Sequence, residues 1–367
     1  MAETGPRVQA ERLKDFCVRV FQQMDVPDED ARITAGVLVA ADLRGVDSHG
    51  VARLRRYKDG LRDGVMFARP KVQVVTETPS TALIDAGAGL GQPVSYRAME
   101  RAIQKAQDVG TGFVTVRNSN HFGIAGYYAM MALEQDCIGI SMTNAAVLVT
   151  PTFGRDAMLG TNPISVAAPA GEERPFVLDM ATSTVPRGKL EVYNRLEKAI
   201  PLGWVTDETG TPTQDAGRAL ENFKTRAGGG LLPLGGAGEV LGGHKGYGLG
   251  LWVDVFCAVL SGAAYSNLVY PKTPDGKPLP SNIGHFFGAW RVDAFRPVEE
   301  FKATMDDLQR RLKSAPRADG QARIYIHGEK EYEEAERRSR EGIPLNAKVT
   351  VDLRAIAGEV GVEYDIE

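Results

Sequence analysis

Cysteine is scarce in this sequence, with three residues among 367: Cys17, Cys137 and Cys257. They lie far apart and form no CxxC pair. An odd, sparse set builds no disulfide framework and is typical of a reducing compartment. We therefore expect a cytoplasmic protein.

Signatures of metal and phosphate binding are also missing. The five histidines include no HExxH pair and no cluster with cysteine, so we expect no metal site. No glycine-rich segment ends in GK[ST], as a P-loop does. The segment nearest to the dinucleotide signature GxGxxG is 87–92, GAGLGQ, which lacks the third glycine and is interpreted as a tight turn. An ordinary Rossmann site is therefore not indicated.

Neither sign of charge dominates, because 43 basic and 47 acidic residues give a net charge of −4. This balance gives no electrostatic reason to expect nucleic acid or a membrane as a partner. The first residues resemble no secretory signal. The most apolar segment, 246–265, is interrupted by Asp254 and is interpreted as a buried helix. We expect the partner to be a small molecule.

What the sequence does contain is an ordinary globular composition, 43% hydrophobic and 25% charged. Apolar spacing predicts three helices before residue 65, and strands and helices alternate after residue 72. The expected helices are 8–24, 28–43, about 48 to 60 or 64, 94–109, 125–135, 297–313 and 329–340; the expected strands are 72–76, 81–84, 112–117, 138–143, 164–168, 175–180 and 348–353; long loops are expected over 203–243 and 271–282.

This alternation predicts an α/β fold whose sheet is covered on at least one face. At 367 residues the chain exceeds the usual size of one domain. We expect a helical N-terminal segment over 1–71, a central α/β lobe over 72–296, and a C-terminal segment over 297–367. The two terminal segments are expected to pack together as one helical lobe.

The most informative stretch is RGVDSHGVARLRRY, residues 44–57. His49, Arg53 and Tyr57 are spaced i, i+4, i+8, which on a helix places all three on one stripe. An arginine grips a carboxylate through two parallel hydrogen bonds, and a histidine passes a proton near neutral pH. Ser48 either caps the helix or bonds the histidine or a substrate. The alternative is a capped surface helix whose arginines, Arg55 and Arg56 above all, are merely solvated.

A second polar turn, NSNHFGIAGY over 118–127, follows a predicted strand. The end of a strand before a helix is where α/β proteins tend to place ligands. The backbone N–H groups of residues 123–125 are candidates to hold a phosphate, and His121 is expected to face the cleft. A turn histidine bonded only to backbone is the alternative. Three weaker segments are 160–163, 178–183 and 242–248, the last with Lys245 among glycines.

Several long motifs occur together and in order. They are RGVDSHGVARLRRY (44–57), NSNHFGIAGYY (118–128), GTNPISVAAP (160–169), VLDMATS (177–183), PRGKLEVY (186–193), GGHKGYGLGL (242–251) and IYIHGEKE (324–331). Together they resemble the malate/L-lactate dehydrogenase family of the second, non-Rossmann type. That family also contains ureidoglycolate, sulfolactate and diketogulonate oxidoreductases and cyclic-imine reductases.

The resemblance implies a nicotinamide cofactor, NAD or NADP, bound by the central α/β lobe in an unusual fold, and a homodimer. It implies hydride transfer between that cofactor and a small 2-oxo or 2-hydroxy acid. By motif position, Ser48 and His49 match the catalytic pair, with His49 preferred as general acid and His121 second. Arg53, Tyr57 and Arg187 are expected at the substrate. The residues expected at the cofactor are His121, Phe122, Gly123, Ile124, Ala125, Thr161, Asp179, Met180, Ala181, Lys245, Gly328, Glu329 and Lys330.

One position discriminates within the family. Similar cyclic-imine reductases have an acidic residue after the Arg-Gly of the PRG segment, where this chain has Lys189. A lysine there supplies no carboxylate to orient a histidine or to serve an iminium ion. We therefore favour oxo-acid reduction over imine reduction. A non-catalytic ligand-binding relative of the same fold is a further alternative.

Overall fold

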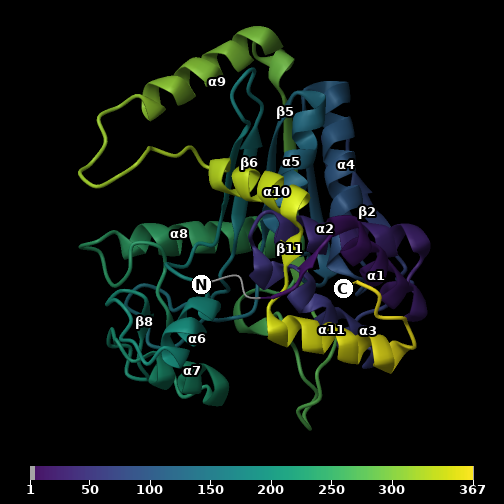
Figure 1. Ribbon diagram of the computed structural model, residues 1–367, viewed down its shortest axis with the longest axis vertical. Coiled ribbons are helices and arrows are strands. Elements are labelled where there is room, and N and C mark those ends of the chain that lie inside the picture. Colours follow the sequence, from purple (N-terminus) through teal and green to yellow (C-terminus); the bar gives the residue numbers. More distant parts are fainter. Residues whose placement is uncertain (1–4, 367) are drawn as a thin grey trace.

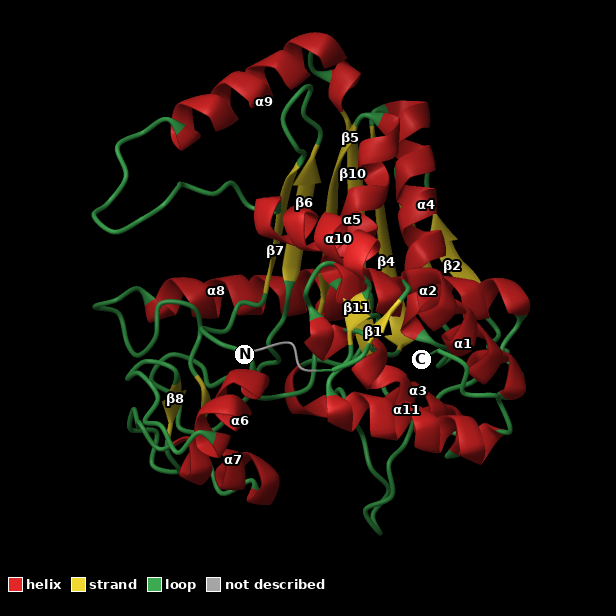
Figure 2. Ribbon diagram, in the orientation of Figure 1, coloured by secondary structure: helices red, strands yellow, loops and turns green. Residues whose placement is uncertain are grey.

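A seven-stranded sheet forms the centre of the structure, a computed structural model that describes residues 5–366 (Figures 1 and 2). Its order is β2-β3-β4-β10-β5-β6-β7. Only β3 and β4 run parallel, and every other neighbouring pair in this sheet is antiparallel. The strands are β2 (Gln73–Glu77), β3 (Thr81–Asp85), β4 (Thr111–Ser119), β5 (Cys137–Thr143), β6 (Ile164–Ala168), β7 (Phe176–Met180) and β10 (Ile283–Arg291). The expected α/β fold is confirmed, and its mostly antiparallel sheet is not the parallel sheet of a Rossmann domain.

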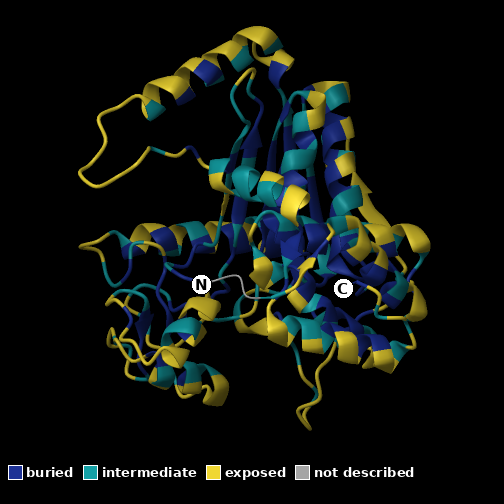
Figure 3. Ribbon diagram, viewed as in Figure 1, coloured by how far each residue is buried: buried dark blue, intermediate teal, exposed yellow. Residues whose placement is uncertain are grey.

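The sequence analysis did not predict β10, although this strand lies in the middle of the sheet. Its sequence, IGHFFGAWR, lacks the alternation of apolar and polar residues that marks a half-exposed strand. Helices cover both faces here, and the first seven residues of β10 are buried (Figure 3). A Cβ at Gly284 would lie 1.9 Å from the carbonyl oxygen of Cys257, so this strand needs glycine where a helix approaches closely.

Two groups of helices cover the sheet. On one face, α4 (Gly91–Val109) and α5 (Ala125–Met131) share an apolar core with β3, β4 and β10. On the other, α8 (Gly243–Asp254) continues as a π-helical turn over Val255–Val259, and Val253 and Cys257 pack on β5 and β10. The segment 246–265, expected to be a buried helix, is therefore buried on one side only. Within residues 5–366, no helix has the length and apolarity needed to cross a bilayer.

The two ends of the chain meet in one helical core. Helices α1 (Ala10–Gln23), α2 (Asp28–Leu43) and α3 (Leu54–Arg62) pack with α11 (Ala347–Val360), and β1 (Arg7–Val8) pairs with β11 (Ile343–Pro344). The predicted strand over 348–353 is wrong. The side chain of Asn346 caps the backbone N–H of Lys348, and Leu353 and Ile356 enter the core at helical spacing.

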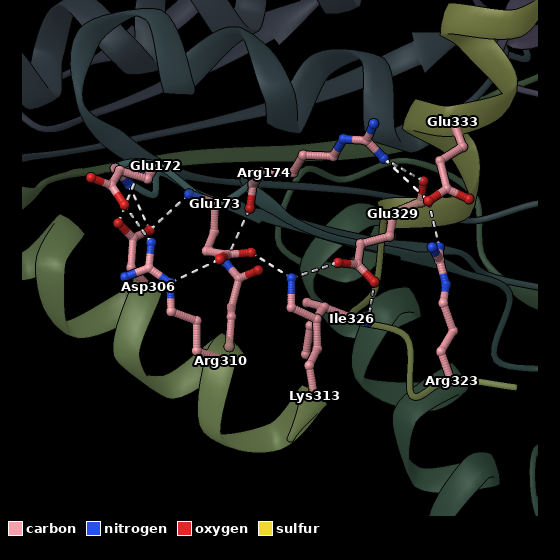
Figure 4. Close-up of polar contacts among 12 residues, drawn as sticks. Glu172, Glu173, Arg174, Asp306, Arg310, Lys313, Arg323, Ile326, Glu329 and Glu333 are labelled. Atoms are coloured by element: carbon pink, nitrogen blue, oxygen red, sulfur yellow. Dashed lines mark hydrogen bonds and ion pairs between the residues drawn. The ribbon is translucent and has the colours of Figure 1, made fainter. Parts of the chain in front are cut away.

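Helix α9 (Val298–Lys313) lies away from this helical core, at the end of the sheet where β6 turns into β7 (Figure 1). Its buried residues are polar, Asp306 and Gln309. Asp306 accepts hydrogen bonds from the backbone N–H groups of Gly171, Glu172 and Glu173 (Figure 4). The leucines of this helix, Leu308 and Leu312, are both about half exposed.

A smaller core lies beside α8. It is formed by α6 (Arg187–Arg195), α7 (Ala216–Thr225) and the paired strands β8 (Val205–Thr206) and β9 (Gly230–Leu231). The segment 203–243, expected to be all loop, thus contains a helix and two short strands. Glycine-rich connections between short elements hid their periodicity. The remaining helix, α10 (Glu329–Glu341), packs on α2.

Candidate active site

The segment that contains Ser48, His49 and Arg53 is not a continuous helix. Two 3-10 turns, Asp47–His49 and Val51–Arg53, are separated by Gly50 in an extended conformation, and α3 begins only at Leu54. The expected helix starting near Ser48 is wrong for this reason, and the i, i+4, i+8 stripe does not lie on one helix. The 3-10 turns nevertheless bring His49, Arg53 and Tyr57 to one region.

Two groups from other elements hold this segment. The buried carboxylate of Asp42, on α2, accepts a hydrogen bond of 2.8 Å from the backbone N–H of Val51. A Cβ at Gly50 would lie 1.9 Å from the same carboxylate, so glycine is required there. Arg338, on α10, donates to the carbonyl oxygen of Asp42 and to the carboxylate of Asp47. The two groups together fix the segment at both of its ends.

His49 and His121 lie together, although 72 positions separate them. Their rings are nearly parallel, 19° apart, with centroids 5.5 Å apart. The hydroxyl of Ser48 is 2.9 Å from Nδ1 of His49, and the hydroxyl of Tyr57 is 2.7 Å from Nδ1 of His121. The two sequence motifs therefore converge on one site, with His121 in the turn after β4.

Two arginines flank the imidazoles. Nε of Arg53 donates to the carbonyl oxygen of Ser48 at 2.6 Å, and its terminal nitrogens form no hydrogen bond or ion pair within residues 5–366. Arg56 donates to the hydroxyl of Tyr270 at 2.7 Å. Arg55 forms ion pairs with Asp352 and Glu359. The alternative in which Arg55 and Arg56 are merely solvated is therefore wrong, and the free end of Arg53 is suited to a carboxylate.

The site disfavours positive charge on either ring. Both histidines remain partly open to solvent, but the surrounding protein lowers the pKa of His49 to about 4, and Arg53 and Arg56 add to the effect. The pKa of His121 is well below its ordinary value, through burial first and then through Arg56 and His49. Both imidazoles are therefore neutral near pH 7 without substrate.

The residues expected at the cofactor gather next to this pair. The carboxylate of Asp179, at the end of β7, accepts a hydrogen bond of 2.7 Å from the backbone N–H of Gly126. Asp179 is exposed, yet surrounding protein raises the pKa of its carboxyl to about 6. The carbonyl oxygen of Thr161 accepts from the N–H of Thr182 at 2.9 Å. Met180 and Ala181 lie between Asp179 and Thr182 in the chain. The turn 121–125, Thr161 and the segment 179–181 are therefore neighbours.

Phe122 is the exception in this group. Its side chain is buried in the core and stacks on His285, with ring centroids 4.7 Å apart. Its carbonyl oxygen accepts from the hydroxyl of Tyr128. Gly123 has a φ of +88°, and a Cβ there would lie 2.5 Å from a methyl carbon of Val37. The turn thus packs against the core through Phe122 and against Val37 at Gly123.

The late segment expected at the cofactor lies beside β7. The carbonyl oxygen of His327 accepts from the N–H of Val177 at 3.0 Å, and Gly328 has a φ of +96°. The carboxylate of Glu329 is occupied within the protein, because it accepts from the N–H of Ile326 and from Lys313 (Figure 4). Lys330 is exposed and lies over the ring of Tyr325.

Two of the expected site residues lie on α6 and α8. Arg187, on α6, forms an ion pair with Glu191 at 3.0 Å, and both are close enough to Arg53 to influence its pKa. The side chain of Lys245, exposed in the first turn of α8, forms no hydrogen bond or ion pair in the described chain. Lys189, the residue that discriminates within the family, is exposed, with Nζ 5.5 Å from the ring centroid of Trp204. Arg187 thus lies near Arg53.

Sequence reasoning missed several residues around the site. Asp42 follows the apolar run VLVAA, and an acid in such a run is a signal that it is buried for a purpose. Gln92, fully buried, starts α4 beside Tyr57. Tyr270 lies in a loop without any motif. Buried His285 is bonded to the hydroxyls of Thr143 and Ser119 at 2.7 and 2.8 Å.

The groups present fit a dinucleotide. The backbone N–H groups of Ile124 and Ala125 bind no acceptor in the part of the chain that is described, and they suit a phosphate. Asp179 offers a carboxylate oxygen of the kind that binds ribose hydroxyls. Among residues 5–366, no group of three or more His, Cys, Asp or Glu residues is placed to hold a metal ion.

Known proteins resemble this chain over nearly its whole length. The family model for malate/L-lactate dehydrogenase matches residues 8–354. The chain is 52% identical to a malate dehydrogenase of Pyrococcus horikoshii, over 97% of this chain and 96% of the relative. It is 38% identical to an L-sulfolactate dehydrogenase of Methanocaldococcus jannaschii, over 97% of each. The crystal structure of a malate dehydrogenase from Entamoeba histolytica matches with a TM-score of 0.92 at 36% identity, covering 98% of this chain and 99% of that one.

These findings first define the class of protein: a 2-hydroxy-acid oxidoreductase that uses a nicotinamide cofactor. More narrowly, the chain belongs to the malate/L-lactate dehydrogenase family. The resemblance drawn from the sequence motifs is confirmed, and so is the class of reaction.

Proposed function

We propose that the substrate is a 2-oxo or 2-hydroxy acid with a second anionic group, as in malate. The observation that supports this most is the free end of Arg53 beside two neutral imidazoles, with Arg56 close by and bonded, among residues 5–366, only to Tyr270. Two guanidinium groups without a carboxylate partner favour a doubly negative ligand. Relatives named for malate and for sulfolactate, which both have two acid groups, support the same choice.

In the proposed mechanism, Arg53 grips the C1 carboxylate and fixes the orientation of C2. His49 gives its proton to the C2 oxygen during reduction and takes it back during oxidation, with Ser48 bonded to the other ring nitrogen. The nicotinamide supplies or accepts the hydride at C2. The turn 121–125, Thr161, the segment 179–181 and the segment 328–330 would hold the cofactor. Whether it is NAD or NADP is part of the test.

The test is turnover by the purified protein, followed by the absorbance of NADH or NADPH. We expect oxaloacetate or another acidic 2-oxo acid to be reduced faster than pyruvate. Arg53→Ala should raise KM for the oxo acid strongly, and Arg53→Lys should restore only part of the affinity because it lacks the fork. The matched control is Arg62→Ala, at the end of the helix α3 that follows Arg53. No turnover with any 2-oxo acid and either cofactor would contradict the function.

We also propose that the protein is a homodimer. Leu251, Val255 and Val259 form an exposed apolar row at i, i+4, i+8 along α8 and its π-helical turn. Val259 is 62% exposed and the adjacent Leu260 is 59% exposed. An uninterrupted row of this kind is unusual on a monomer's surface and is typical of a protein interface.

We propose the cytoplasm as its compartment. All three cysteines are buried and free, and none lies in a disulfide within residues 5–366. Buried thiols survive best where reducing conditions prevail. Fractionation of cells that express the protein, with an antibody against it, tests the assignment. Recovery in a secreted or membrane fraction would overturn it.

A further inference from the structure

We propose that His121 is a fixed hydrogen-bond donor, which holds a substrate oxygen through Nε2–H, and that His49 alone moves the proton. The proposal deepens the proposed function and rests on it. The sequence motifs rank His49 before His121 as general acid, and the proposal gives the two imidazoles different tasks.

Nδ1 of His121 has two hydrogen-bonding partners within the protein. The backbone nitrogen of Gly123 is 3.3 Å away, and a backbone N–H can only donate. The hydroxyl oxygen of Tyr57 is 2.7 Å from the same nitrogen. A neutral imidazole has one nitrogen with a lone pair and one with a proton. Nδ1 therefore has the lone pair, and the proton is on Nε2.

The surroundings prevent the opposite tautomer. Tyr57 is fully buried, so its hydroxyl has little freedom to turn away from the ring. Gly123 has a φ of +88° and packs closely on Val37, which fixes the direction of its N–H. A proton on Nδ1 would point at the hydrogen of that N–H, and the two hydrogens would repel each other. A positive ring would also lie close to Arg56 and Arg53, which oppose it.

His49 is held differently. Its Nδ1 is bonded to the hydroxyl of Ser48, which can either donate or accept. His49 can therefore gain and lose a proton without losing this partner. Nε2 of each ring has no hydrogen-bond partner in the described residues, and both rings are partly open to solvent. Both nitrogens are thus available to a ligand bound between the arginine and the cofactor residues.

The chemistry balances with these roles. During reduction the C2 oxygen accepts a hydrogen bond from Nε2–H of His121 and a proton from the imidazolium of His49. C2 gains the hydride that the cofactor provides, and the C=O bond becomes C–OH. His49 ends neutral and takes a new proton from water, whereas His121 keeps its proton throughout. A donor in place before the reaction stabilises the developing charge on oxygen.

The first test is nitrogen-15 NMR of the full-length enzyme without substrate, with His121 assigned by its absence from His121→Gln. We expect a bare Nδ1 and a protonated Nε2 at neutral pH. In Tyr57→Phe the Nδ1 resonance should shift because it loses one of its two donors. A proton on Nδ1, or a positively charged ring at neutral pH, would overturn the proposal. This readout does not depend on any substrate.

The second test compares two amide variants. The side-chain nitrogen of glutamine reaches the place of Nε2, and that of asparagine reaches the place of Nδ1. His121→Gln should keep kcat within about tenfold of the wild type, as expected for a weakened neutral hydrogen bond. His121→Asn should lose more. An asparagine variant that is more active than the glutamine variant would overturn the assignment.

The pH profile separates the two histidines. His49→Gln should lower kcat by about 10²–10⁴-fold and remove the limb of the profile that reports the acid. His121→Gln should keep that limb. If the limb disappears in His121→Gln instead, the roles are reversed. If the wild type reduces no 2-oxo acid, the proposed function fails, but the NMR result still decides the tautomer.

Discussion

His49 lies close to the positive charges of two arginines. Arg53 and Arg56 add to burial in holding its pKa at about 4 in the free enzyme. In the proposed mechanism, a bound dianion would offset the two guanidinium groups and lower the electrostatic cost of protonating the ring. The substrate would thus help to create the acid that protonates its C2 oxygen. In the oxidation direction, the free enzyme already has the neutral base that it needs.

A pH dependence follows for kcat/KM, which reports the free enzyme. Oxidation requires neutral His49, so kcat/KM for the 2-hydroxy acid should be level near neutral pH and fall as the pH drops through about 4. Reduction requires the protonated ring, so its kcat/KM should decrease as the pH rises above about 4. Initial rates with buffers of constant ionic strength measure both. An oxidation limb at the ordinary histidine pKa would contradict this account.

The carboxyl group of Asp42, which lies close to the candidate active site, has an unusually high pKa. Burial raises its pKa to about 8, against the hydrogen bond from Val51, which favours the charged form. The folded protein therefore keeps a proton on Asp42 at pH values where the unfolded chain has lost it. By linkage, this group lowers stability as the pH rises from about 4 to about 8.

We expect Asp42→Asn to remove this dependence, because the amide still accepts from Val51 and does not ionise. Melting temperatures of the wild type relative to Asp42→Asn should therefore fall as the pH rises through this range. Asp42→Ala should be about 1–3 kcal/mol less stable than Asp42→Asn at any pH, since it leaves the N–H of Val51 unsatisfied. Gly50→Ala, which forces a Cβ onto the same carboxylate, should also impair turnover. Parallel pH profiles for the wild type and Asp42→Asn would refute the role of the carboxyl.

Helix α9 is attached to the end of the sheet by its polar face. Asp306 binds three backbone N–H groups of the turn between β6 and β7, and Lys313 joins Glu173 to Glu329 (Figure 4). Glu329 in turn accepts from the N–H of Ile326. The helix thus connects the sheet to the segment 326–330 through polar contacts, while Leu308 and Leu312 are about half exposed.

Asp306→Ala should lower the free energy of unfolding by about 1–3 kcal/mol, because three backbone donors lose their acceptor. Asp307→Ala, one position along, removes only an exposed ion pair with Arg311 and should cost about 0.5 kcal/mol or less. Urea unfolding of the two variants gives the comparison. Equal losses would mean that Asp306 contributes no more than its exposed neighbour. The Michaelis constant for the cofactor should rise only in Asp306→Ala.

The exposed apolar row on α8 and its π-helical turn leads to a test of whether two copies of the chain associate. Val255→Glu with Val259→Glu places two charges in the row and should convert a dimer to monomers in sedimentation velocity. Val109→Glu, at an exposed apolar site on α4, is the matched control and should leave the mass unchanged. A wild-type protein that sediments as a monomer at micromolar concentration would end the dimer proposal.

The sequence was sufficient for elements whose residues meet water on one side. Helices α1, α2, α4 and α10 and the strand β3 lie close to their predicted ranges, because a one-sided surface imposes a period. The strands β5 and β6 are buried almost throughout and were recognised as short apolar runs. β10 was missed because both of its faces are buried and glycines interrupt its apolar run, and α11 was mistaken for a strand within the segment KVTVDL, where alternation is accidental. Periodicity alone does not resolve such segments.

The site shows the same division. His49, Arg53 and His121 were proposed because their chemistry is visible in short motifs, and the structure places them together; their roles stay predictions. Asp42, Tyr270 and Gln92 were not found, because they act through contacts between residues far apart in the chain. The expected helix stripe had the right residues on the wrong local structure, since Gly50 interrupts it.

The pairing of β1 with β11 has a consequence for how the enzyme comes into being. Leu353 and Ile356, near the C-terminus, share a core with Leu54 and Tyr57, which support the reacting centre from behind. A ribosome releases the N-terminal helices long before it makes these partners. A nascent chain therefore contains His49, Arg53 and His121 well before it contains α11, which completes the core behind them. Competence should emerge only as synthesis finishes, and a chain cut short before α11 should be inert although it lacks no residue of the reacting centre.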